Sequence, residues 1–292
     1  MLDLSEEPAR LSVRLAQLVI EREGKPEVTV PLEDLAVLVV AHPRIQFTHA
    51  VLSGLAQAGG ALVVCNERYL PIAMLLPIET HSIQAERFAR QAEAALPTKK
   101  RVWQQIAQAK VRAQGRLIAT LRGDDQGLFA LADLVRSGDP TNIEAQASRR
   151  YWTALFPDQK FLRDPDGKDQ NRYLNYGYAI LRAIVARAVC AAGLHPSLGV
   201  HHHNRYDAFC LADDLMEPFR PIVDKAVVEL CAARGADAPL DKEAKAVLIQ
   251  ALYGRFTVEG ESRTLFDIVA RAASSLAAVF AGQRKGLVLP EV

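Results

Sequence analysis

Ala61-Leu-Val-Val-Cys-Asn-Glu-Arg-Tyr-Leu-Pro-Ile-Ala-Met-Leu-Leu-Pro-Ile-Glu-Thr-His81 is the stretch in which the sequence changes character. Two short, continuous apolar runs within it, Ala61–Cys65 and Ile72–Leu76, have the length and composition of buried β-strands. From about residue 81 onward, the apolar residues instead recur with the 3.6-residue period of an amphipathic helix. The stretch therefore predicts that a strand-rich part ends and a helical part begins near residues 79–82.

The residues before this stretch predict further strands. Leu35–Val40 is a continuous run of mostly branched apolar residues, and apolar residues alternate with polar ones around 11–15 and 28–30. Breakers at Gly24-Lys-Pro26, Pro43 and Gly59-Gly60 separate these segments. The spacing over 46–57 predicts one short helix that crosses between strands. Residues 1–80 are therefore expected to form a small β-rich N-terminal domain.

The residues after the stretch predict helices, with dense alanine and no strand-like alternation. The expected helical ranges are 81–96, 99–121, 126–136, 142–156, 174–193, 208–235, 240–254 and 262–282. Residues 81–292 would then form a larger, all-α catalytic domain. The expected fold class is therefore α+β, with two domains that meet near residue 80.

Composition sets limits on the function. The chain has 292 residues, of which 50% are hydrophobic and 24% charged, so it has the balance of an ordinary globular protein and not of a disordered one. The formal net charge is only +1, so a nucleic-acid partner would need locally concentrated positive charge. The cysteines form no Cys-x-x-Cys pair, which argues against a thiolate zinc cluster or redox motif; they are Cys65, Cys190, Cys210 and Cys231.

The sequence also predicts where the protein works. The N-terminal residues are acidic and lack the apolar core of a signal peptide. No run reaches the roughly 18 apolar residues that suggest a membrane-spanning helix. We therefore expect a cytoplasmic protein that makes no membrane contact.

One segment concentrates positive charge. Residues 79–122 carry nine Lys or Arg side chains and three Glu, a local balance of +6. Cations on these helices could follow a phosphate backbone, and Trp103 could stack on a base. The alternative is a solvated helix face with Trp103 in the core. The candidate DNA contacts are Lys99, Lys100, Arg101, Lys110 and Arg112.

A second segment combines histidines with acids. Three adjacent histidines, residues 201–203, follow a Gly- and Pro-containing connection. Asp214 and Glu217 come next at i, i+3 spacing, which places both carboxylates on one helix face. Pro218 and Pro221 should bend this helix or end its first piece. Close carboxylates repel one another, so a divalent cation between them is the usual solution, and removal of one acid is expected to leave the fold intact or more stable.

A third possible ligand lies elsewhere in the chain. Thr141 or Asn142 could cap a helix, which would place Glu144 in its first turn, where the helix dipole favours a carboxylate. Oxygen ligands suit Mg²⁺ or Mn²⁺, and an imidazole shifts the preference toward Mn²⁺ or a transition metal. Each feature also has an ordinary interpretation, as a packed or surface histidine, a solvated acidic face or a charge at a helix start.

Taken together, three motifs resemble the universal CRISPR-associated spacer-acquisition integrase family. They are Asp139-Pro-Thr-Asn-Ile-Glu-Ala-Gln-Ala-Ser-Arg-Arg-Tyr-Trp152, Leu194-His-Pro-Ser-Leu-Gly-Val-His-His202 and Asp214-Leu-Met-Glu-Pro-Phe-Arg-Pro-Ile-Val-Asp224. The segment Lys99-Lys-Arg-Val-Trp-Gln-Gln-Ile-Ala-Gln-Ala-Lys110 looks like the form found in type II systems, which use a single RNA-guided effector nuclease. The resemblance covers roughly residues 80–235.

The resemblance implies a metal-dependent DNA endonuclease and integrase that inserts short duplex DNA, as new spacers, into a CRISPR repeat array. Glu144, Glu217 and the histidine twelve residues before Asp214, which is His202, would bind Mg²⁺ or Mn²⁺. Asp214 would be a further catalytic acid, either an outer-shell partner or a second-metal ligand.

The resemblance also implies partners. The chain would bind double-stranded DNA and form a homodimer through its β-rich domain, and two dimers would flank a dimer of a small ferredoxin-like adaptation partner in a heterohexamer. Two other functions compete with this one: a non-catalytic helical DNA-binding assembly protein, and a helical metallophosphohydrolase.

Overall fold

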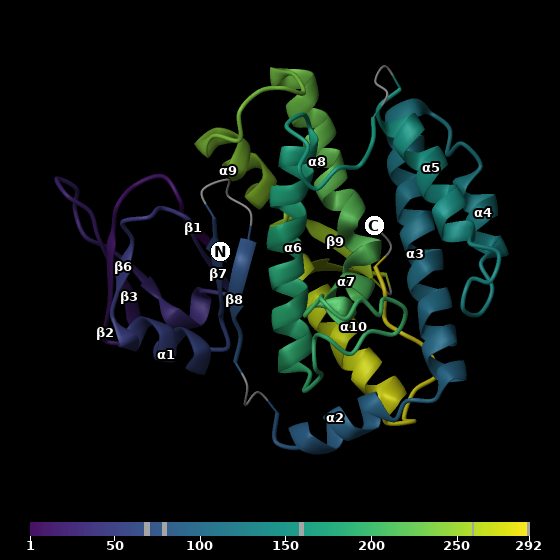
Figure 1. The fold of residues 1–292 in the computed structure, drawn as a ribbon, viewed down its shortest axis with the longest axis horizontal. Coiled ribbons are helices and arrows are strands. Elements are labelled where there is room, and N and C mark those ends of the chain that lie inside the picture. Colours follow the sequence, from purple (N-terminus) through teal and green to yellow (C-terminus); the bar gives the residue numbers. More distant parts are fainter. Residues whose placement is uncertain (67–70, 78–80, 158–160, 259, 291–292) are drawn as a thin grey trace.

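The computed structural model describes residues 1–66, 71–77, 81–157, 161–258 and 260–290. A strand-rich part lies on one side of a larger helical body (Figure 1). Its outer sheet has the order β4-β3-β2-β6, in which β2, β3 and β4 are antiparallel neighbours and β6 pairs in parallel with β2. The strands are β2 (Arg10–Arg14), β3 (Gln17–Glu21), β4 (Val28–Pro31) and β6 (Gln46–Phe47).

A second sheet lies between this outer sheet and the helices. Its order is β1-β5-β7-β8, with β1 (Leu2–Leu4), β5 (Val37–Val40) and β7 (Ala61–Cys65) parallel and β8 (Pro71–Leu75) antiparallel to β7. The 3-10 turn η1 (Leu32–Asp34) precedes β5, and helix α1 (His49–Gln57) connects β6 to β7. Both faces of β5 are covered, which explains why its sequence is a continuous apolar run.

The two faces of β5 belong to different cores. Val37 and Val39 pack in the large core with the helices, whereas Leu38 and Val40 pack in a small core with the outer sheet and α1. Successive side chains of a strand point to opposite sides, so one strand serves both cores. The second sheet thereby joins the N-terminal part directly to the helical body.

The helical body is arranged around α6. This helix is buried along most of its length and contacts α7, α8, α9 and α10, while α3, α4 and α5 pack together beside it (Figure 1). The helices are α2 (Gln84–Ala92), α3 (Leu96–Arg122), α4 (Leu128–Leu134), α5 (Ile143–Leu155), α6 (Asn171–Ala191), α7 (Cys210–Met216), α8 (Arg220–Arg234), α9 (Lys242–Ala251) and α10 (Leu265–Phe280).

The expected α+β class is confirmed, since strands dominate the first part and helices the second. The region expected to be all-α contains a hairpin that was not predicted, formed by β9 (Arg255–Val258) and β10 (Glu261–Thr264). Both strands are short and largely exposed, so they carry almost no alternating apolar signal. None of the described helices is both long and apolar enough to span a membrane.

Candidate functional site

Glu144 lies in the first turn of α5, as predicted, and Asn142 occupies the N-cap position, but the expected capping by the Thr141 or Asn142 side chain is not found. Asn142 adopts a left-handed backbone conformation, with φ of 52°, and its side chain makes no capping hydrogen bond. Asp139 caps the helix instead, because its carboxylate accepts hydrogen bonds from the backbone N–H groups of Ile143 and Glu144, both at 2.9 Å. The turn before α5 therefore fixes the start of the helix and the position of Glu144.

Glu217 lies at a break between two helices, which confirms the effect expected of Pro218 and Pro221. Helix α7 ends at Met216, a 3-10 turn, η2 (Glu217–Phe219), follows, and α8 starts at Arg220. Apolar residues of this segment face the core, as predicted: Leu211, Leu215 and Phe219 are fully buried. The break leaves the Glu217 carboxylate facing α3.

Two cations neutralise Glu217. Its Oε1 accepts a hydrogen bond of 2.8 Å from Nε of Arg220, and its Oε2 lies 2.6 Å from Nζ of Lys110. Burial raises the pKa of Glu217, but the attraction of Arg220 and Lys110 outweighs this effect and lowers the pKa to about 2. Glu217 is therefore ionised at neutral pH although only 5% of the residue is exposed.

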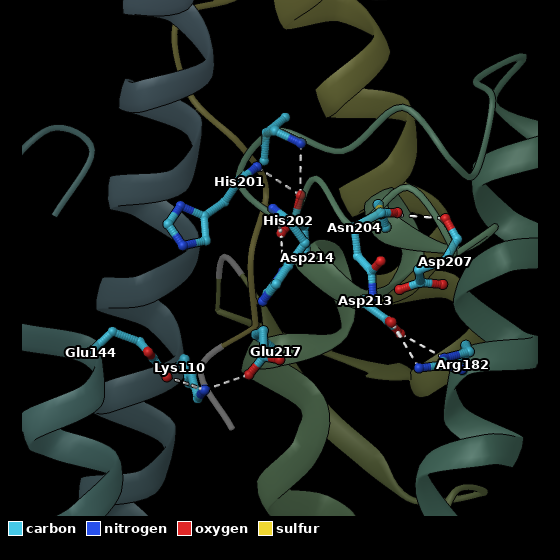
Figure 2. Close-up of polar contacts among 12 residues, drawn as sticks. Lys110, Glu144, Arg182, His201, His202, Asn204, Asp207, Asp213, Asp214 and Glu217 are labelled. Carbon is cyan, nitrogen blue, oxygen red and sulfur yellow. Dashed lines mark hydrogen bonds and ion pairs between the residues drawn. The ribbon is translucent and has the colours of Figure 1, made fainter. Parts of the chain in front are cut away.

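Lys110 was expected among the DNA contacts, but the structure places it between Glu144 and Glu217, which we call the acidic cluster. Its ammonium group pairs with Oε1 of Glu144 as well as with Glu217, and its side chain is only 12% exposed. Figure 2 shows Lys110 between the two glutamates. Oε1 of Glu144 also accepts a hydrogen bond of 3.0 Å from the hydroxyl group of Ser148. One lysine thus brings together two acids from α5 and η2.

Asp214 fixes the backbone of the histidine segment, residues 200–203, through hydrogen bonds to three of its N–H groups. Its Oδ2 accepts hydrogen bonds from the backbone N–H groups of Val200 and His201, at 2.7 and 3.0 Å, and its Oδ1 accepts one from His202 at 3.2 Å. A Cβ atom at Gly199 would come within 2.4 Å of the His202 carbonyl oxygen and 3.0 Å of Oδ2 of Asp214, so this close approach requires glycine. Asp214 itself is fully buried.

The same carboxylate orients one imidazole. Oδ1 of Asp214 lies 2.6 Å from Nδ1 of His202, and this hydrogen bond raises the pKa of His202 against the opposing effect of burial. Because Nδ1 is engaged by the carboxylate, Nε2 is the nitrogen left for a metal or a substrate. The His202 side chain is 46% exposed, so this nitrogen can be reached from solvent.

His201 has a different environment. Its ring stacks on Trp103, with centroids 3.9 Å apart and an angle of 3° between the planes, and burial lowers its pKa. Trp103 is buried in the core, in agreement with the alternative that it packs rather than stacks on a base. Buried Gln91 of α2 fixes the start of the same segment, since its amide donates to the carbonyl oxygens of His195 and Leu198 at 2.9 Å each.

Sequence reasoning did not predict Lys110, Trp103 or Gln91 as parts of this site. The other candidate DNA contacts lie outside the acidic cluster. Lys100 and Arg101 are exposed near the start of α3, and Lys99 beside them is partly exposed. Arg112 lies further along α3 and pairs with Asp133 at 2.8 Å.

A cavity of about 670 Å³ adjoins the acidic cluster, and Lys110 and Glu217 form part of its wall. Three arginines from other parts of the chain also line it: Arg163, Arg182 and Arg220. The three arginines would suit an anionic group, and the cavity lies beside Lys110 and Glu217.

The donor types at this site, two carboxylates and one imidazole, are those that a divalent cation accepts. Within the ranges that the structure describes, no three His, Cys, Asp or Glu side chains lie close enough to hold a metal ion. Glu144 and Glu217 nevertheless face one common cation, the Lys110 ammonium group. Oε2 of Glu217 is buried and is held by the ion pair with Lys110, so a divalent cation could take the place of the ammonium group there.

Known proteins match almost the whole chain. The family model described as CRISPR associated protein Cas1 matches residues 2–251. The CRISPR-associated endonuclease Cas1 of Neisseria meningitidis serogroup C (strain 8013) is 36% identical over 293 residues, which cover 99% of this chain and 95% of that protein. CRISPR-associated endonuclease Cas1 2 of Pyrobaculum aerophilum is 28% identical, over 92% of this chain and 95% of that protein.

Solved structures share the fold. A casposase bound to an integration product superposes with a TM-score of 0.79 at 18% identity, over 98% of this chain and 92% of that one. A Cas1 protein from Thermotoga maritima superposes with a TM-score of 0.76 at 16% identity, over 97% of each chain. The family model and the Neisseria relative confirm the resemblance that the sequence motifs carried, and the chain belongs to the CRISPR-associated Cas1 family of DNA endonucleases.

Proposed function

We propose that this protein joins the 3′ ends of short duplex DNA to a CRISPR repeat array, with Glu144, His202 and Glu217 as the ligands of Mg²⁺ or Mn²⁺. The observation that carries the proposal is the convergence of two carboxylates on one cation beside a histidine that Asp214 orients. Carboxylate oxygens and one imidazole are the ligand types that Mn²⁺ accepts, and Mg²⁺ accepts the oxygens.

The side chains of the site would have different roles in phosphoryl transfer. A bound divalent cation would act as a Lewis acid on the charge that develops at the phosphodiester. Asp214 holds Nδ1 of His202 and so presents Nε2, while Arg220 fixes the Glu217 carboxylate. The arginines that line the adjoining cavity would bind DNA phosphates. A DNA hydroxyl or a water molecule would serve as the nucleophile, so one site accounts for both integration and cleavage.

Removal of the metal tests this function. Labelled short duplex and a plasmid with a repeat array should give joined product in Mg²⁺ or Mn²⁺ and no product in EDTA, whereas duplex binding in EDTA should persist because it depends on many phosphate contacts. Product in EDTA would contradict metal catalysis. Binding without product in either metal would favour a non-catalytic assembly protein, and turnover of a small phosphate monoester without DNA joining would favour a metallophosphohydrolase.

We also propose the partners of the reaction. Structural neighbours include Cas6-RT-Cas1–Cas2 complexes, a casposase bound to an integration product and a TtCas1–DNA complex, which support DNA and Cas proteins as partners of this chain. Each protomer offers one acidic cluster, and a duplex has two ends, so a homodimer in which residues 1–80 make the dimer and partner contacts is the simplest unit. Two such dimers would flank a ferredoxin-like Cas2 dimer. The four free cysteines suit the reducing cytoplasm, which we propose as the compartment.

The start of α3 is proposed to bind the phosphate backbone. Replacement of Lys99, Lys100 and Arg101 together by Ala should weaken binding of all duplex sequences by similar factors, because phosphate contacts carry no sequence information. The slope of log K against log salt should flatten by up to about 0.9 for each lost contact. Titrations of two unrelated duplexes at several salt concentrations measure both effects. An unchanged affinity and slope would show that these side chains form only a solvated face.

A further inference from the structure

The acidic cluster contains its own cation. Lys110 of α3 contacts Glu144 of α5 and Glu217 of η2, and its side chain is almost fully covered. Arg220 holds the other oxygen of Glu217, and Ser148 donates to Glu144. Each of these contacts orients a carboxylate toward the space that the ammonium group fills.

Charge balance explains why a lysine occupies this position. Two carboxylates that share a poorly solvated site repel one another unless a positive charge lies between them. The ammonium group of Lys110 forms ion pairs with both carboxylates and supplies the balance that a divalent cation would supply in its place.

We propose that Lys110 is a built-in competitor of the catalytic metal: its ammonium group keeps Glu144 and Glu217 paired in the metal-free enzyme and must leave before a divalent cation can bind them. The proposal rests on the ligand set proposed above. The ammonium group and a metal ion need the same carboxylate oxygens, so the two cannot occupy the space together. The adjoining cavity gives the displaced side chain room, since Lys110 already forms part of its wall.

Metal affinity without DNA tests the competition directly. Lys110→Met keeps the length and the packing of the side chain but removes its charge. The full-length variant, stripped of metal with EDTA and dialysed, should bind Mn²⁺ at least about tenfold more tightly than the wild type in calorimetric titrations, since close charge pairs couple by more than the energy of one factor of ten. Lys225→Met removes an exposed lysine of α8 and should match the wild type. Equal or weaker binding by Lys110→Met would overturn the proposal.

Glu217→Gln separates this inference from the ligand assignment. If Glu217→Gln loses Mn²⁺ binding while Lys110→Met binds Mn²⁺ like the wild type, the ligands stand and the competition is rejected. If Mn²⁺ binding is undiminished in Glu217→Gln, the ligand set itself is rejected.

A measurement on the wild type does not depend on whether Lys110→Met folds. Lys110 should react slowly with acetic anhydride in EDTA and faster in Mn²⁺, as followed by mass spectrometry of its peptide, because displacement exposes the amine. A rate that is unchanged or slower in Mn²⁺ would contradict displacement.

Discussion

Strand transfer and DNA cleavage are expected to fall by about a thousandfold or more in Glu144→Gln, His202→Ala and Glu217→Gln. A metal ion stabilises the charge of a phosphoryl-transfer transition state by several kcal/mol, and each 1.36 kcal/mol corresponds to a factor of ten. Duplex binding should change little, because it depends on many phosphate contacts and not on the transition state. Strand transfer in Mn²⁺, measured beside a binding titration of the same preparations, separates the two effects.

The neighbouring histidines provide the matched controls. His201 stacks on Trp103 and is not oriented by a carboxylate side chain, while His202 makes the contact with Asp214 through Nδ1. His201→Ala and His203→Ala should therefore retain most of the activity that His202→Ala loses. Near-normal activity in His202→Ala would reject the assignment, and an inactive His201→Ala or His203→Ala would move it by one residue.

The structure changes the expected effect of Glu217→Gln on stability. Repulsion between the acids alone predicts a metal-free fold that is as stable as before or more stable. Glu217 instead neutralises Lys110 and Arg220, which are both partly buried, so its replacement leaves two cations with less compensation. Loss of one partner from a buried ion pair typically costs about 3 kcal/mol or more, and we expect the free energy of unfolding in EDTA to fall by about this amount. Urea denaturation measures it.

Asp214→Asn is expected to weaken Mn²⁺ binding by about 10- to 100-fold and to reduce strand transfer at low Mn²⁺ by a similar factor. The carboxylate accepts from three backbone N–H groups and contacts Nδ1 of His202, whereas an amide has one oxygen and would turn its N–H₂ group toward donors. The free energy of unfolding should also fall by about 3 kcal/mol, because buried donors lose a charged acceptor.

Asp213→Asn is the control for this variant, since the same change is made one residue earlier on α7. Asp213 pairs with Arg182, at 2.6 and 2.7 Å, whereas Asp214 forms the hydrogen bond with the His202 ring. Its replacement should leave the Mn²⁺ dependence of strand transfer unchanged. Metal affinity of Asp214→Asn within twofold of the wild type would show that the carboxylate does not orient His202.

Local patterns in the sequence predicted much of the fold. The continuous run at 37–40 is a strand because both of its faces are buried, and the change to a 3.6-residue period near residue 81 marks the start of the helices. Pro218 and Pro221 end one helix and start the next, as expected from the missing N–H donor of proline. Strands β1, β3, β6, β9 and β10 were not predicted. Four of them have only two to four residues each, and β3 has three adjacent buried residues and therefore no alternation.

The sequence by itself determined the relations that depend on spacing along one segment. Spacing of i, i+3 predicted that Asp214 and Glu217 lie on one helix face, but in the structure Asp214 accepts from the backbone N–H groups of residues 200–202 whereas Glu217 pairs with Lys110 and Arg220. The family resemblance selected His202, and it is the histidine whose ring contacts Asp214. A start signal before α5 placed Glu144 in its first turn. The start and the break of a helix follow from local backbone geometry, which depends mostly on neighbours in the chain.

Only the tertiary structure decided what surrounds these groups. Lys110 looked like one more cation of a basic helix, because charge counted along the sequence does not show which face of α3 packs against α5 and η2. Asp139, and not Asn142, caps α5, because the backbone at 142 turns into the left-handed region. Packing between helices that are distant in the sequence sets burial and charge pairing. For this reason Lys110, which was predicted to contact DNA, is the counter-ion of the proposed metal ligands Glu144 and Glu217.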